Sequence, residues 1–145
     1  MANDSNTLTA VLDTLIPPSA DGRLPGAGEL GLADAIGEAL GDSELLSQSL
    51  EALDESARQA GAACFAELGL DPRSECLRES AESNPALLPG LIFHTYSNYY
   101  RNPRVLEALG LEARPPFPLG YTLEAGDPTL LDPVRRRDPF YRKVD

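Results

Sequence analysis

Apolar residues recur at helical spacing in one segment after another along this 145-residue chain. No segment alternates apolar and polar residues for long enough to predict a β-strand. Proline and glycine separate the helical segments, because proline cannot donate to the helix ladder and glycine commonly ends a helix. The pattern predicts an all-α fold, with a single small helical domain of about five to six helices over residues 1–110.

The first helix is expected to end at Pro17-Pro18. Its apolar stripe comprises Leu8, Val11, Leu12, Leu15 and Ile16, and its N-cap is expected at Ser5, Asn6 or Thr7. The corner formed by Ile16, Pro17 and Pro18 is a candidate docking edge for a partner protein. The alternative is that Ile16 belongs to the core and the two prolines only shape the exit from the helix.

The remaining helices are predicted from apolar spacing and from their starts. A second helix is expected over residues 32–40, and a third from Asp42 or Ser43 to Leu68, where Gly69 closes it. Each later helix opens at an N-cap residue followed by proline in the first helical position. These pairs are Asp71-Pro72, Asn84-Pro85 and Asn102-Pro103.

Residues 111–145 differ in composition from the helical domain, because they combine six prolines with many apolar side chains. Disordered tails are usually poor in large apolar residues, so we expect an extended tail that packs either on the body or on a partner. Its candidate partner-binding residues are Phe117, Tyr121, Phe140 and Tyr141.

Charge is distributed unevenly around a formal net charge of −11. Residues 1–72 carry 13 acidic and 2 basic side chains, whereas residues 73–145 carry 10 of each. This balance argues against nucleic-acid binding, which needs clustered positive charge. The basic cluster Arg135–Arg137, Arg142 and Lys143 is either solvated, paired with the acidic half, or an anchor on an acidic partner.

Few residues are suited to catalysis. One histidine and two cysteines cannot build a four-ligand zinc site, a di-iron bundle or an HExxH site, and the nucleotide-binding glycine motifs do not occur. We expect no metal site and no catalytic site; His94 is the single candidate for acid–base chemistry, against a structural or surface role. Glu51, Asp54 and Glu55 are expected to form a solvated helix face.

An aromatic stretch near residue 96 is the most informative local feature. Tyr96, Tyr99 and Tyr100 lie on or beside one helical face with Phe93. Such a stripe is either core or a partner contact, and tyrosine is enriched at interface hot spots. We therefore take these three tyrosines as candidate partner-binding residues.

Two segments together resemble the gluconate 2-dehydrogenase subunit 3 family. The first contains Asp13-Thr14-Leu15-Ile16-Pro17, then Pro25-Gly26-Ala27, then a helix opening at residues 31–36. The second is the aromatic run 93–103, with Asn98 where the family usually has glycine. The order of these elements, over about residues 7–121, carries the resemblance.

The resemblance implies a non-catalytic small subunit that stabilises, or assists maturation of, a larger FAD-dependent oxidoreductase. That partner resembles the glucose-methanol-choline flavoproteins acting on sugars, polyols or alcohols, and FAD is expected in the partner and not in this chain. The alternative is a stand-alone helical enzyme or ligand-binding module with a site near His94.

The expected location is the cytoplasm. Many small subunits of this family resemble twin-arginine export substrates, but residues 1–6 contain no basic cluster and no apolar segment follows them. No apolar run approaches the length of a membrane-spanning helix, so no membrane insertion is expected.

Overall fold

The computed structural model describes residues 2–41, 44–83, 85, 87–138 and 141. The chain divides into two compact units, Met1–Pro115 and Pro116–Asp145, called here the body and the tail. Throughout the described ranges the secondary structure is helical, with no strand, as predicted.

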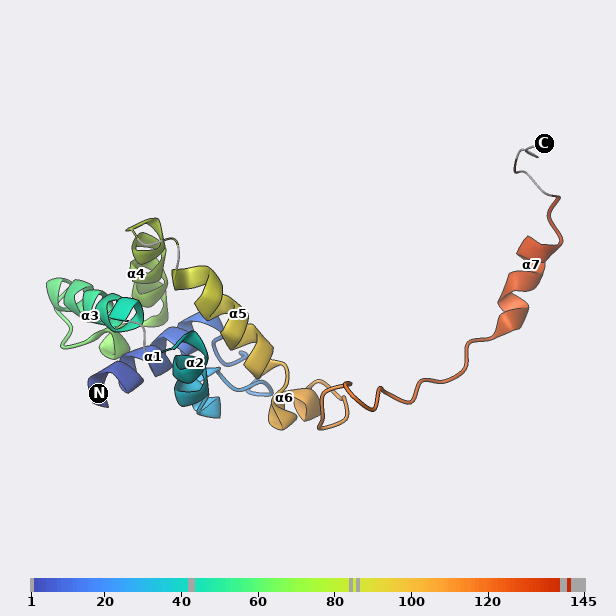
Figure 1. Cartoon of the computed structure of the whole chain (residues 1–145), viewed down its shortest axis with the longest axis horizontal. Coiled ribbons are helices and arrows are strands. Elements are labelled where there is room, and N and C mark those ends of the chain that lie inside the picture. Colours follow the sequence, from blue (N-terminus) through green and yellow to red (C-terminus); the bar gives the residue numbers. More distant parts are fainter. Residues whose placement is uncertain (1, 42–43, 84, 86, 139–140, 142–145) are drawn as a thin grey trace. The chain divides into compact units, whose positions relative to one another are not determined.

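The body contains six α-helices and two short 3-10 helices in its described part (Figure 1). Their bounds are α1 Ala2–Leu15, η1 Gly28–Leu30, α2 Ala33–Leu40, α3 Glu44–Gln59, η2 Phe65–Glu67, α4 Leu70–Ser83, α5 Leu87–Tyr99 and α6 Pro103–Ala108. The tail contains η3 Pro128–Leu131 and α7 Asp132–Arg135.

Helix α1 is the centre of the body, because it contacts α2, α3, α4 and α5 as well as both 3-10 helices (Figure 1). Its residues Val11 and Leu12 are almost fully buried. They pack in one core with Ile36 of α2, Leu50 of α3 and Leu91 of α5. One continuous apolar core therefore holds the helices in place.

The first helix begins earlier than expected, since α1 starts at Ala2 and includes Ser5, Asn6 and Thr7. Thr7 is fully buried and uses its hydroxyl inside the core instead of capping the helix. The Asp42, Ser43 and Asn84 caps lie outside the described residues.

The third helix is shorter than predicted. It ends at Gln59, and Gly61 turns the chain back at φ +89°. The amide of Gly61 donates to the Arg58 carbonyl and that of Ala62 to the Ala57 carbonyl, each at 3.0 Å. These bonds form a Schellman cap, which only a residue tolerant of positive φ completes without strain. The prediction extended the helix to Leu68 because alanine-rich spacing continues past this cap.

Of the three predicted helix starts at proline, the one at Asn102-Pro103 is confirmed, and the one at Asp71-Pro72 is wrong by one or two residues. Asn102 caps α6, accepting from the Arg104 amide at 3.0 Å, as predicted. Helix α4 begins at Leu70, so Asp71 and Pro72 occupy its first turn instead of preceding it.

Candidate functional site

The segment between α1 and α2 is folded tightly onto α1. Asp13 accepts a hydrogen bond from the Gly28 amide at 2.7 Å, and the Ala27 amide donates to the Ile16 carbonyl at 2.9 Å. A side chain on Gly28 would place its Cβ 2.6 Å from the Thr9 carbonyl oxygen, so the loop needs glycine there. Burial raises the pKa of Asp13 above its usual 3.8. These contacts hold the loop between α1 and α2 against α1, so the sequence motif there has a structural role in the body.

Tyr99 holds the same loop from the other side, which corrects its assignment as a partner contact. Its hydroxyl donates to the Pro25 carbonyl at 2.9 Å, and the residue is 1% exposed. Leu91 and Thr95 precede it at intervals of four on the buried face of α5. Tyr99 is therefore a core residue and presents no surface to a partner.

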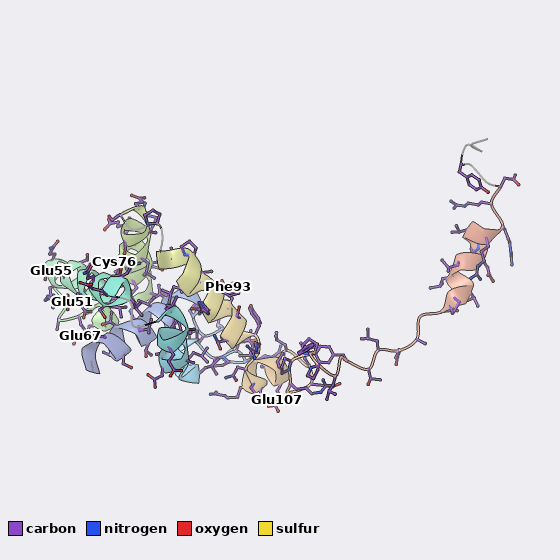
Figure 2. The ribbon with its side chains drawn as sticks, in the orientation of Figure 1. Glu51, Glu55, Glu67, Cys76, Phe93 and Glu107 are labelled. Atoms are coloured by element: carbon purple, nitrogen blue, oxygen red, sulfur yellow. The ribbon has the colours of Figure 1, made fainter. Side chains whose placement is uncertain are left out.

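Three exposed aromatic residues are called here the aromatic ridge, namely Phe93 and Tyr96 on α5 and Tyr100 directly after its end (Figure 2 labels Phe93). Their exposed fractions are 65%, 44% and 50%. The Tyr96 and Tyr100 ring centroids lie 6.1 Å apart, so these two residues form a continuous aromatic surface. The tyrosines were predicted to be either core residues or partner contacts. Tyr99 is a core residue, whereas Tyr96 and Tyr100 face solvent and are accessible to a partner.

At the end of α1, Pro17 and Pro18 are exposed, whereas Ile16 is half-buried and packs against the core. The prolines are thus accessible to a partner. Ile16 serves mainly the packing of the body.

His94 shows no catalytic arrangement. It is half-buried, its ring meets Phe93 edge to face at 5.3 Å, and its carbonyl accepts from the Asn98 side chain at 2.8 Å. Among the described residues no carboxylate pairs with the His94 ring, so nothing orients it as a general base. The same residues hold no group of three or more histidine, cysteine or acidic side chains that fits a metal ion.

A groove of about 350 Å³ lies between α3 and α4 and contains Cys76 (labelled in Figure 2). The other lining residues are mostly hydroxyl-bearing or apolar, namely Leu45, Gln48, Ser49, Ala52, Leu53, Ser56, Glu79, Ser80 and Ser83. Burial, together with Glu79 and Glu75, raises the pKa of the Cys76 thiol. A raised pKa leaves less thiolate at neutral pH, so Cys76 is a weaker nucleophile than an ordinary cysteine.

Asp54 differs from its expected place on a solvated face. It is 5% exposed and accepts from the Thr7 hydroxyl and the Phe65 amide, both at 2.9 Å. Its two partners come from α1 and η2, so one carboxylate links three elements. Its neighbours Glu51 and Glu55 are exposed on α3, as predicted (Figure 2).

In the tail, the predicted partner-binding residues are largely accessible. Phe117 is 86% exposed and Tyr141 72%, while Tyr121 is half-buried. Phe140 lies outside the described residues. Within the described part of the chain no helix is both long and apolar enough to cross a membrane.

Comparison with known protein families identifies a match over most of the chain. The family model described as gluconate 2-dehydrogenase subunit 3 matches residues 2–109, which covers almost the whole body. The aromatic ridge and the loop between α1 and α2 lie inside the matched range, and the tail lies outside it. No curated protein and no solved structure matches the chain.

Proposed function

The chain belongs to the gluconate 2-dehydrogenase subunit 3 family, and we propose that it is a non-catalytic accessory subunit of a flavin-dependent dehydrogenase complex. Its partner is a larger oxidoreductase of the glucose-methanol-choline type that binds FAD and acts on sugars, polyols or alcohols. The complex is located in the cytoplasm. This chain stabilises the partner and contributes no reacting group.

The observation that supports this proposal most strongly is the aromatic ridge. Exposed apolar side chains that gather into one patch commonly mark a site of interaction with another protein. Tyrosine suits such a surface because its ring buries apolar area while its hydroxyl stays hydrogen-bonded. The rings of Tyr96 and Tyr100 are exposed, and the buried Tyr99 fixes the end of α5 beside them.

The chain's own candidate reactive groups favour the same conclusion. His94 has no orienting carboxylate among the described residues, and burial raises the pKa of the Cys76 thiol, which disfavours the thiolate. The chemistry is therefore assigned to the partner, and the small subunit is assigned the role of a rigid helical platform.

The ridge is tested with a tagged chain purified from its source cells. Replacing Tyr96 and Tyr100 by alanine removes two of the three rings of the ridge. The double variant should bind the larger chain about thirtyfold more weakly, as expected for hot-spot residues. The matched control is Leu70→Ala, because Leu70 is also an exposed apolar residue, 47% accessible, but belongs to α4. Equal retention of the larger chain by both variants would refute the ridge as the contact.

Stoichiometry separates the two forms of the proposal. A stable complex with one small chain for each large chain indicates a permanent subunit. Transient binding only to the flavin-free partner indicates a maturation factor.

A further inference from the structure

The groove between α3 and α4 is large enough to hold a small organic molecule. Its volume of about 350 Å³ lies within the range of small-molecule sites in proteins, about 300–1,000 Å³. Its most buried lining residues are Ser49 and Leu53 of α3, and the half-buried Cys76 comes from α4 (Figure 2 labels Cys76). The groove shares no lining residue with the aromatic ridge, so it is a separate site from the proposed partner contact.

The hydroxyl groups along the rim of the groove are already used as donors. Ser56 and Ser83 each donate to the backbone carbonyl four residues earlier, at 3.0 Å and 3.2 Å. A serine hydroxyl has one proton and two lone pairs, so each of these can only accept a further hydrogen bond. Gln48 directs its side-chain nitrogen to Glu44 at 3.1 Å, which leaves its carbonyl oxygen available. These groups therefore favour a ligand that is rich in N–H donors.

Glu79 adds a negative charge to the groove. It is the only charged side chain among the described lining residues, and no lysine, arginine or histidine accompanies it there. The neighbouring Arg78 pairs with Glu75 and Glu82 instead, at 2.5 Å and 2.7 Å. Burial raises the pKa of the Cys76 thiol and the charge of Glu79 raises it further, so the carboxylate acts on the interior of the groove. The groove therefore repels anions and attracts cations.

Apolar side chains determine which kind of cation fits. Leu45 is 42% exposed on α3, and Ala52 is exposed two turns later on the same helix. Both offer a surface to a short hydrocarbon chain, which an inorganic ion lacks. The described residues also contain no cluster of side chains that fits a metal ion. The lining therefore selects an organic ammonium ion with a hydrocarbon chain.

We propose that this groove binds a linear alkyl diamine or polyamine, with an ammonium group at Glu79 and the methylene chain along Leu45 and Ala52. An ammonium group provides three N–H donors, which the carboxylate and the serine oxygens accept. Residues 1–72 carry 13 acidic and 2 basic side chains, and this excess attracts such a cation over a longer range. The site does not depend on the proposed function, because no partner chain contributes to it.

Isothermal titration calorimetry on the full-length chain tests the ligand class. The probes share one carbon-chain length: putrescine is the diamine, butanediol is its neutral counterpart and succinate is the dianion. Putrescine should bind at least about tenfold more tightly than butanediol, because only the diamine carries positive charge to Glu79. Succinate should give no detectable binding, because Glu79 repels it.

Two glutamine variants test the role of Glu79. Glu79→Gln should weaken putrescine binding at least about tenfold, because it removes the charge that pairs with the ammonium group. The matched control is Glu107→Gln, which changes the net charge equally on α6, where Figure 2 shows Glu107 well apart from Cys76. The control should change the affinity less than about twofold. Both glutamates are exposed, and an unchanged circular dichroism spectrum confirms that each variant is folded.

Amide chemical shifts locate the ligand on the wild-type chain. Putrescine should shift the amides of the lining residues of α3 and α4 more than those elsewhere. Shifts centred on other elements would overturn the site, as would the absence of putrescine binding. Equal weakening by Glu79→Gln and Glu107→Gln would show attraction by net charge alone, and equal affinity for butanediol would show a neutral ligand; either result contradicts the inference. None of these results involves a larger chain, so the accessory-subunit proposal stands or fails separately.

Discussion

Replacing Asp54 by alanine should destabilise the body strongly, because one buried carboxylate oxygen serves two elements. The Thr7 hydroxyl of α1 and the Phe65 amide of η2 both donate to this oxygen at 2.9 Å. Phe65 is fully buried, so its amide has no access to water once the acceptor is removed.

The magnitude follows from those two bonds. A hydrogen bond to a charged group contributes about 1.5–3 kcal/mol, and a buried donor left without an acceptor costs about 1–3 kcal/mol. Loss of both hydrogen bonds should lower the free energy of unfolding by about 3–5 kcal/mol. That is a large share of the total free energy of unfolding of a typical domain, about 5–15 kcal/mol. For a body of this size the melting temperature should fall by about 10–20 °C. Asp54→Asn keeps the accepting oxygen and should cost about 1 kcal/mol.

Urea denaturation followed by circular dichroism measures these changes. The matched control is Glu51→Ala, which removes an exposed carboxylate from the same helix and should alter stability by less than about 0.5 kcal/mol. If Asp54→Ala and Glu51→Ala unfold at the same urea concentration, the buried link among α1, α3 and η2 does not stabilise the body.

Two further predictions concern the loop between α1 and α2. Tyr99→Phe removes only the hydroxyl that donates to Pro25 and should cost about 1–2 kcal/mol in urea denaturation, without weakening partner binding directly; an unchanged midpoint would contradict the bond. The pKa of Asp13 is raised, so the Asp13 carboxyl binds its proton more tightly in the folded body than in the unfolded chain. Its contribution to the free energy of unfolding therefore declines as pH rises from 3.8 through the pKa of the folded state. Asp13→Asn keeps an oxygen for the Gly28 amide and removes this decline; identical pH profiles of unfolding for wild type and variant would refute it.

Helix type and order could be predicted from the sequence because local rules determine them. Proline and an N-cap residue specify a helix start, and the Asn102 cap of α6 appears as expected. Local rules do not specify where an alanine-rich helix stops. The end of α3 at Gln59 depends on Gly61 at positive φ and on Asp54 holding the Phe65 amide, which is a contact between distant elements.

The candidate surface was predictable only in part. Leu91, Thr95 and Tyr99 are spaced four residues apart and therefore lie on one stripe of α5, which is buried. The three tyrosines are close in sequence, but Tyr99 belongs to this buried stripe, whereas Tyr96, three residues earlier, is 44% exposed at its edge. A similar signal existed for Asp54, which follows the buried Leu50 by one helical turn and therefore lies on the apolar face of α3.

The central claim is that this chain is the small partner of a flavoprotein. The most direct test is the absorbance spectrum of the complex that a tagged, full-length chain retains from its source cells, together with its native mass. The account predicts a yellow eluate with a flavin spectrum and a mass equal to this 15.5 kDa chain plus one larger chain. A colourless eluate containing the 15.5 kDa chain alone would contradict it.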